Sequence, residues 1–333
     1  MLRFRLRKGY APPIRVKGLR RTSESIATME RFNMGGVQQW VVIRGHDRTR
    51  PLLLFFHGGP GASQLGAQRK YLPELEESYV VVNWDYRGAG KNYTPNIPPE
   101  TMTMGHLLEE ARELAVQLLH RFGQRKLFVM GQSFGALFGL RFIYTYPELV
   151  HAYVGVNQPT HRAEEERRSY EWVLGEAGSR DVAKAVHQLK EIGSPVDGLY
   201  KTMDDFVIQR RWLTKLGGVT YRKSPTQLNV ISNLFTPELS WKERVRFPRG
   251  FAFSNTHLWA EFVEHNLFKE IKEVKVPVYF VAGEHDRICH DLIFDYADLL
   301  SAPHKEVIRF HSSGHIACFE EPEAFLNLMN RDL

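Results

Sequence analysis

Short apolar runs without polar alternation are the feature that most restricts what this chain can fold into. They are rich in β-branched and aromatic residues, as strands are, and they occupy residues 40–45, 51–59, 79–88, 126–131, 151–157, 276–286 and 305–310. Strands that are apolar at every position are buried on both faces, as in a parallel sheet covered by helices. We therefore expect an α/β fold with a doubly wound, mostly parallel sheet.

Helix-like segments separate these runs. The first is an amphipathic helix within 100–123 that ends near Gly123, because apolar residues recur there at three-to-four spacing: Leu107, Ala111, Leu114, Leu118 and Phe122. A second helix is expected over 134–146, where Pro147 ends it, a third over 291–301 and a last one from about Pro322.

The alternation of strands and helices breaks between Gln158 and the strand at 276–286. This stretch is polar and helical in pattern. The sequence therefore predicts one α/β core, made of residues 1–157 and 267–333, with a helical cap inserted at 158–266. Within the core, residues 1–24 are interpreted as a basic arm.

Charge is distributed unevenly along the 333 residues, whose formal net charge is +6. Subtracting the eight cations that precede the first acid, Glu24, leaves −2 for the rest of the chain. We interpret the arm as solvated or as an edge strand, with weak contact to an anionic membrane surface as the alternative. Nothing else predicts a nucleic-acid partner. The eight cations are Arg3, Arg5, Arg7, Lys8, Arg15, Lys17, Arg20 and Arg21.

Hydropathy and cysteine content favour a cytoplasmic protein. No apolar run approaches the ~20 residues of a membrane-spanning helix, and the charged start is unlike a signal peptide. Cys289 and Cys318 cannot build a disulfide framework and lack zinc-finger spacing. We expect both to be buried, inert thiols. Each lies three positions after a residue that is considered below as catalytic, Asp286 or His315.

A candidate nucleophile lies between a predicted strand and a predicted helix. Residues 131–135, Gly-Gln-Ser-Phe-Gly, match the G-x-S-x-G pattern, in which a strained turn exposes the serine at the carboxyl edge of the sheet. A serine hydroxyl needs a base to take its proton, and the base needs a carboxylate to orient it. We therefore predict Ser133 as the nucleophile of a serine hydrolase.

The acid and the base are expected downstream, in the chain order serine, acid, histidine. Asp286 ends one predicted strand, and His315 lies in a loop after the next. Both positions are at the sheet edge that carries Ser133, so these two residues are preferred over their neighbours. The competing acids are Glu284 and Asp291, and the competing bases are His285 and His311.

A glycine-rich loop at 57–61, His-Gly-Gly-Pro-Gly, overlaps the end of the predicted strand at 51–59. An oxyanion needs two backbone N–H donors and a loop without side chains that block the substrate. We predict Gly59 and Phe134, the residue after the nucleophile, as these donors, and Gly58 as part of the substrate-binding loop. Arg87 is interpreted as a structural donor that braces its own turn.

The motifs together resemble those of the α/β-hydrolase superfamily, and within it the proline iminopeptidase (prolyl aminopeptidase) group. The sequence has HGGPG at 57–61, DYRGAGKN at 85–92 and GQSFG at 131–135, with GEHD and SGH around the acid and the base. The similarity covers about residues 25–157 and 270–333. It departs from the family pattern at Phe134, where the family has tryptophan, and at 253–259, FSNTHLW, where an acid is expected.

The resemblance implies release of an N-terminal residue, typically proline, from small peptides, without a metal or an organic cofactor. In this family cap glutamates hold the substrate ammonium group. The candidates here are Glu164, Glu171, Asp204 and Asp205, beside Glu165 and Glu166. The alternative is an esterase, thioesterase or lactonase with the same triad, since such an enzyme needs no acid for an amine. Either reading expects a small-molecule or short-peptide substrate, and the oligomeric state is left open.

Overall fold

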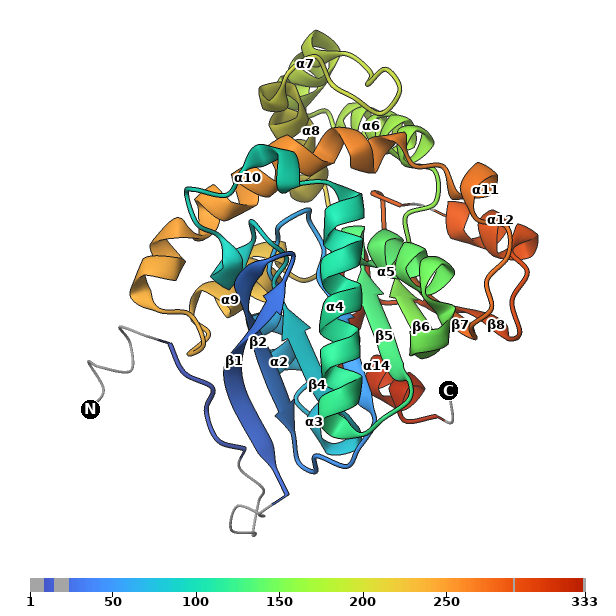
Figure 1. Cartoon of the computed structure of the whole chain (residues 1–333). Coiled ribbons are helices and arrows are strands. Elements are labelled where there is room, and N and C mark those ends of the chain that lie inside the picture. Colours follow the sequence, from blue (N-terminus) through green and yellow to red (C-terminus); the bar gives the residue numbers. More distant parts are fainter. Residues whose placement is uncertain (1–8, 15–23, 290, 332–333) are drawn as a thin grey trace.

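An eight-stranded sheet forms the centre of the computed structural model, which describes residues 9–14, 24–289 and 291–331, apart from the side chains of residues 227, 229 and 230 (Figure 1). The predicted arm therefore lies mostly outside the described residues, at 1–8 and 15–23. The strands are β1 (Ile26–Met34), β2 (Val37–Gly45), β3 (Leu52–Phe56), β4 (Val80–Trp84), β5 (Leu127–Gln132), β6 (Val150–Val156), β7 (Val278–Gly283) and β8 (Lys305–Phe310).

The strand order is β1-β2-β4-β3-β5-β6-β7-β8. Strand β2 runs antiparallel to β1 and β4, and the remaining pairs are parallel. The expected α/β fold with a mostly parallel sheet is therefore confirmed. Strand β1 was not predicted, because charged residues such as Glu30 and Arg31 interrupt its apolar pattern on a half-solvated edge.

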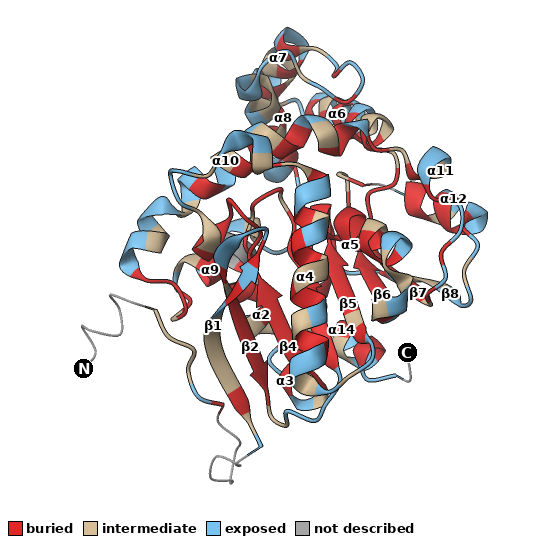
Figure 2. Cartoon of the chain, in the orientation of Figure 1, coloured by how far each residue is buried: buried red, intermediate tan, exposed pale blue. Residues whose placement is uncertain are grey.

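Helices cover both faces of the sheet. One core contains residues of α4 and α5, and the other contains residues of α2, α3, α13 and α14. Figure 2 shows the central strands buried between these layers, whereas β1 at the edge is mostly half-buried. The helices of the two layers are α2 (Leu65–Tyr71), α3 (Leu75–Ser78), α4 (Met104–Phe122), α5 (Phe134–Thr145), α12 (Leu292–Leu299), α13 (Ala317–Glu320) and α14 (Pro322–Met329).

Helix α4 follows its sequence signals closely. The Thr103 side chain accepts a hydrogen bond from the His106 N–H at the N-terminus, and Gly123 ends the helix with φ of 64°. The predicted apolar face packs in the core, with Leu107, Ala111 and Leu114 fully buried. Short 3₁₀ turns lie at Gly90–Asn92, Pro99–Thr101 and Pro147–Leu149.

The helices between β6 and β7 lie over the carboxyl ends of the strands (Figure 1). Three of them share a core of their own, which includes Tyr170, Val173, Leu189 and Trp212. No described helix is long and apolar enough to cross a membrane. The helices are α6 (Arg162–Ser179), α7 (Ala183–Ile192), α8 (Met203–Lys215), α9 (Ser232–Leu234) and α10 (Trp241–Glu264), with a π-helical turn at Thr226–Ile231 and α11 (Leu267–Glu270) after them.

Candidate active site

Ser133 occupies the turn between β5 and α5, with φ of 55°. Both flanking glycines are required there. A Cβ on Gly131 would lie 2.2 Å from the Gly135 carbonyl oxygen, and one on Gly135 would lie 2.1 Å from that of Phe56. The positive φ and the two close approaches are the strained elbow that the motif predicts.

His315 and Asp286 lie next to this serine. Ser133 Oγ is 2.8 Å from His315 Nε2, and His315 Nδ1 is 2.9 Å from Asp286 Oδ2. An ionised carboxylate only accepts hydrogen bonds, so Nδ1 carries the proton and Nε2 accepts from the hydroxyl. The structure thus brings the three predicted residues into one hydrogen-bonded chain, and all three are buried.

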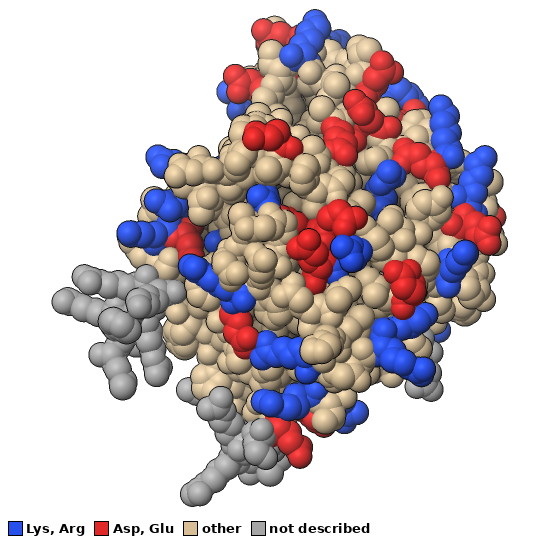
Figure 3. Space-filling model, in the orientation of Figure 1, with Lys and Arg blue, Asp and Glu red and all other residues tan. Residues whose placement is uncertain are grey.

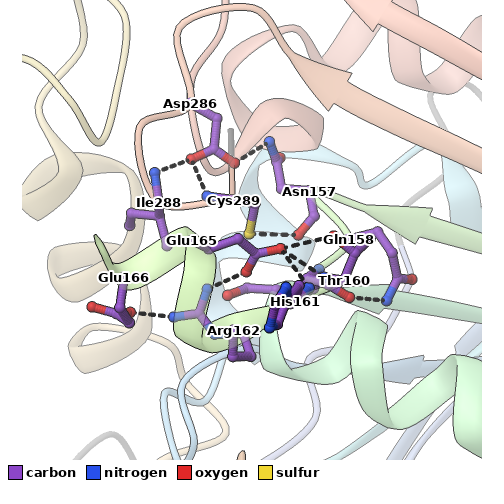
Figure 4. Close-up of polar contacts among 12 residues, drawn as sticks. Asn157, Gln158, Thr160, His161, Arg162, Glu165, Glu166, Asp286, Ile288 and Cys289 are labelled. Atoms are coloured by element: carbon purple, nitrogen blue, oxygen red, sulfur yellow. Dashed lines mark hydrogen bonds and ion pairs between the residues drawn. The ribbon is translucent and has the colours of Figure 1, made fainter. Parts of the chain in front are cut away.

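The Asp286 carboxylate is held ionised by its surroundings. Its Oδ1 accepts hydrogen bonds from the backbone N–H groups of Ile288 and Cys289, at 2.7 and 3.2 Å (Figure 4). Burial alone would raise the pKa of Asp286, but His315 and these N–H donors outweigh burial, and the pKa lies below its ordinary value. The site therefore keeps a negative charge beside the imidazole.

Asn157, directly after β6, joins the acid loop to the base loop. Its Nδ2 donates to Asp286 Oδ2 at 2.9 Å and to the Gly314 carbonyl at 3.0 Å. Its Oδ1 accepts from the Ala317 N–H at 3.2 Å. Asn157 has φ of 49°, a conformation that asparagine tolerates better than most residues. Asn157 was not predicted, because its one signal in the sequence is a polar side chain at a strand end.

A second hydrogen-bonded chain joins the glycine-rich loop to the His315 loop. The Gly58 N–H donates to Gln64 Oε1 at 3.1 Å, and Gln64 Nε2 donates to Gln132 Oε1 at 2.8 Å. Gln132 Nε2 in turn donates to the His315 carbonyl at 2.7 Å. Neither glutamine was singled out from the sequence, because a buried amide has no motif of its own. The chain fixes the loop relative to the base.

Two backbone N–H groups close to Ser133 in the chain or in the cavity wall have no acceptor within the described protein. The Gly58 N–H is used by Gln64, but among the described residues neither the Gly59 nor the Phe134 N–H donates to another protein group. Phe134 begins α5, where the first N–H groups have no partner within the helix. Gly59 lines the cavity in front of Ser133. These are the two donors that the sequence predicts for an oxyanion.

Arg87 is buried away from that cavity. Its guanidinium pairs with Glu110 of α4 and donates to the Gly35 carbonyl, so it braces the turn after β4 as interpreted. In the same motif, Asp85 Oδ2 accepts from the Lys91 N–H at 2.9 Å. These hydrogen bonds stabilise the turn after β4, next to the site.

The competing acids and bases have other partners. His311 pairs with Glu284 at 2.5 Å, and Asp291 pairs with Arg309 at 3.3 Å, both on the surface. The His285 ring stacks on Tyr221, with ring centroids 3.9 Å apart. None of these side chains contacts Ser133.

A cavity of about 620 Å³ opens in front of Ser133 and His315. Much of its wall is apolar, including Phe206, Phe251, Trp259 and Phe262. Apart from His315, every ionisable side chain on the wall among the described residues is a cation: Arg162, Arg210, Arg211 and Lys215.

The four cap acids predicted to bind substrate do not line this cavity, which corrects that expectation. Glu164 pairs with Arg167 and Arg168, and Glu171 pairs with Arg167, all along the solvent side of α6. Asp205 accepts from the Thr202 N–H in the capping box of α8, and Asp204 is exposed in the same first turn. These acids stabilise helix ends and surfaces. Gly58 likewise lies behind the wall, against Gln132.

Two buried acids do lie near the cavity, and both are bound to a wall cation. Arg162 pairs with Glu165 at 2.5 Å and with Glu166 (Figure 4), while Arg210 also pairs with Glu166. Burial raises the pKa of Glu165 despite the Arg162 charge. Glu166 Oε2 is buried without a hydrogen-bond partner among the described residues.

Asp286, Cys289 and His315 are the described residues that place three potential metal ligands together, within 4.8 Å of one another. The atoms of Asp286 and His315 concerned already bond each other. Burial raises the pKa of the Cys289 thiol well above its ordinary value, whereas metals bind the thiolate. The arrangement therefore suits proton transfer at Ser133 better than metal binding.

Comparisons with known proteins agree with the fold. Residues 51–193 match the family model of the alpha/beta hydrolase fold. The chain is 32% identical to the "Probable aminopeptidase YbaC" of Bacillus subtilis, over 92% of this chain and 96% of the relative. It is 26% identical to a 2-hydroxy-6-oxo-6-(2'-aminophenyl)hexa-2,4-dienoic acid hydrolase of Metapseudomonas resinovorans, over 92% and 90%. A proline iminopeptidase-related protein of Thermus thermophilus has the same fold, with a TM-score of 0.61 and 16% identity over 91% and 96% of the two chains.

Proposed function

We propose that this chain, which belongs to the α/β-hydrolase family and is similar to proline iminopeptidases, is a serine hydrolase that forms an acyl-enzyme on Ser133. The observation that carries the proposal is the hydrogen-bonded chain from Ser133 Oγ to His315 Nε2, at 2.8 Å, and from His315 Nδ1 to Asp286, at 2.9 Å. A serine with this base and this orienting acid is equipped for nucleophilic attack.

The reaction has two steps. His315 Nε2 takes the proton of the Ser133 hydroxyl as Oγ attacks the substrate carbonyl carbon, and the N–H groups of Gly59 and Phe134 face the oxyanion. The protonated His315 then donates to the leaving group, and the acyl-enzyme remains. In the second step water, deprotonated by His315, attacks the acyl carbon, the bond from that carbon to Ser133 Oγ breaks, and His315 returns the proton to Oγ as the acid is released. Asp286 stabilises the imidazolium throughout.

The helices over the strand ends have a role in this proposal. Residues 158–266 act as a cap, since side chains of α6, α8 and α10 supply much of the cavity wall opposite Ser133. The cap would exclude water from the reacting centre and select the acyl group, for which the apolar wall suits a small hydrophobic substituent.

The first candidate substrate is a peptide or amide with a free N-terminal residue, typically proline in the group to which this chain is similar. A relative named a probable aminopeptidase, with 32% identity over nearly the whole chain, supports it. The candidate acid for an ammonium group is Glu166, because it pairs with the wall cations Arg162 and Arg210 and its Oε2 has no hydrogen-bond partner among the described residues.

The second candidate is a small ester, thioester or lactone. The cations on the cavity wall favour it, because Arg211 and Lys215 have no carboxylate partner among the described residues and would repel a substrate ammonium group. Paired as it is with both Arg162 and Arg210, Glu166 is already neutralised in part.

The two candidates are separated by kcat/KM on a prolyl 4-nitroanilide, its N-acetylated twin and a 4-nitrophenyl ester, with Ser133→Ala as the inactive control. An aminopeptidase cleaves the prolyl 4-nitroanilide but not its N-acetylated twin. An esterase cleaves the ester rapidly and neither amide. Turnover of any of the three by Ser133→Ala at the wild-type rate would overturn the proposed function itself.

A further inference from the structure

A second cavity, of about 330 Å³, adjoins the active-site cavity and is lined by cations. Its charged and aromatic wall consists of Trp172, Arg180, Lys215, Tyr221, Arg222, His285 and Arg287, and we name it the basic vestibule. No carboxylate lines it among the described residues. A concave surface of one charge sign concentrates ligands of the opposite sign.

Three of these cations have no acidic partner among the residues that the structure describes. Arg222 lies over the Tyr221 ring and Arg287 over the Trp172 ring, at 4.7 and 5.8 Å from the ring centroids. Within the described part of the chain, no carboxylate oxygen lies within 4.0 Å of Lys215, Arg222 or Arg287, whereas Arg180 pairs with Glu176. The face drawn in Figure 3 differs, since cations and acids are interspersed there. The vestibule cations therefore have donors to offer a ligand.

The vestibule wall is also well positioned by its neighbours. The His285 ring stacks on Tyr221 with an interplanar angle of 7°, and its backbone N–H donates to the Ser313 carbonyl at 2.9 Å. The Tyr221 N–H donates to the buried Glu320, which also accepts from the Gly314 N–H. The Tyr221 ring held in this way keeps Arg222 above it near one geometry, which lowers the entropy cost of binding.

The vestibule and the active-site cavity share two segments of chain. Lys215 lines both cavities, Val219 and Ile288 line the active-site cavity, and their neighbours Thr220 and Arg287 line the vestibule. The same segments hold the triad, because the His315 N–H donates to the Val219 carbonyl at 2.7 Å and Arg287 follows Asp286 directly. One extended molecule can therefore reach both.

We propose that the basic vestibule binds an anionic group, carboxylate or phosphate, of a substrate whose scissile carbonyl lies at Ser133; this rests on the proposed serine-hydrolase function. The substrate is then a small molecule with an apolar acyl region in the active-site cavity and a negative charge beyond it. A short peptide with a free C-terminal carboxylate and an acidic ester both fit this class. Lys215, Arg222 and Arg287 are its specificity residues.

Binding is tested first, independently of turnover, by isothermal titration of the Ser133→Ala protein. The probes are glutarate, inorganic phosphate and the neutral glutaramide. We expect at least one anion to bind, glutaramide not to bind, and Arg222→Gln/Arg287→Gln to weaken anion binding about tenfold, as for the loss of hydrogen bonds to a charged group. Tighter binding of glutarate identifies a carboxylate ligand, and tighter binding of phosphate a phosphate ligand. The matched control Arg331→Gln removes an exposed arginine that pairs with Glu306 elsewhere.

Turnover is tested with matched pairs: mono-4-nitrophenyl glutarate against 4-nitrophenyl valerate, and Pro-Ala against Pro-Ala amide. The kcat/KM ratio of the anionic to the neutral member is expected to exceed one and to fall about tenfold in Arg222→Gln/Arg287→Gln. The neutral member reports the state of the triad. Arg287 adjoins Asp286, so the double variant could also disturb the triad. If it loses turnover of the neutral substrates, Arg222→Gln alone replaces it in the comparison.

Equal anion binding in the wild type, the double variant and Arg331→Gln, together with a ratio that stays at one, would overturn the vestibule proposal while Ser133-dependent hydrolysis persists. Absence of Ser133-dependent hydrolysis of every substrate would instead overturn the proposed function. In that case anion binding that depends on Arg222 and Arg287 would still establish the vestibule as an anion site.

Discussion

The two walls of the active-site cavity differ in how their polar groups are used. On the sheet side, Asp286, Asn157 and Gln132 are buried and bonded to one another's loops. On the helical side, Arg211 and Lys215 of α8 are exposed and have no carboxylate partner among the described residues. The sheet therefore fixes the geometry of the reacting groups, whereas the helices present charge that a substrate can use.

Replacing Asp286 by Asn is expected to give the largest effect, because it removes the charged member of the triad on the sheet side of the cavity. The amide keeps the shape of the carboxylate but removes the charge that holds the His315 Nδ1 proton. We expect kcat to fall roughly 10³–10⁴-fold, measured by steady-state kinetics on the best substrate. A loss below tenfold would show that Asp286 does not orient the base.

Replacing Asn157 by Ala tests a residue that acts only through others. It removes the hydrogen bonds to Asp286, Gly314 and Ala317, so the acid and base loops lose their common anchor. We expect kcat to fall roughly 10- to 100-fold with little change in KM, by analogy with supporting residues at other sites. A rise in KM at constant kcat would place Asn157 in substrate binding instead.

Glu320 makes the stability of the sheet side depend on pH. Burial raises its pKa from 4.5 to about 7, although N–H donors, Tyr221 among them, oppose this. Between these two values the native state holds a proton that the unfolded chain has released, so stability falls as the pH rises. Over that range the loss is at most about 3 kcal/mol.

The test compares the free energy of unfolding of wild type and Glu320→Gln across that pH range, by urea denaturation. The variant has no proton to release here, so its curve should be flatter than that of the wild type. Parallel curves would show that Glu320 titrates near its ordinary pKa.

The smallest effect is expected for Glu164→Gln, on the solvent side of the cap. Glu164 pairs with Arg167 and Arg168 at the surface and does not reach the cavity. Its removal should change kcat/KM by less than twofold and stability by about 0.5 kcal/mol or less. A large rise in KM for a free-amine substrate, and none for its acetylated twin, would restore Glu164 as an amine ligand.

The sequence predicted those parts of the fold and site whose signals are local. Continuous apolar runs indicated seven of the strands, and the glycines around Ser133 indicated the turn before the structure placed it against His315. Strand β1 escaped because a half-exposed edge strand carries charges. The chain order of acid and base made Asp286 and His315 the preferred pair.

Contacts between distant segments could not be predicted from the sequence. Gln64 meets Gln132, and Asn157 meets Asp286, only because the sheet order brings β3, β5, β6 and β7 side by side. The cap acids were misassigned for the same reason, since helical spacing does not say which face of α6 turns toward Ser133. The vestibule likewise needs residues 172, 215–222 and 285–287 to meet in space.

Covalent labelling with a fluorophosphonate, followed by peptide mass spectrometry, tests most directly whether Ser133 is the nucleophile. The expected result is one adduct per chain on the peptide that contains Ser133, and no adduct in Ser133→Ala. An unlabelled wild-type protein, or an adduct that persists in Ser133→Ala, would contradict it.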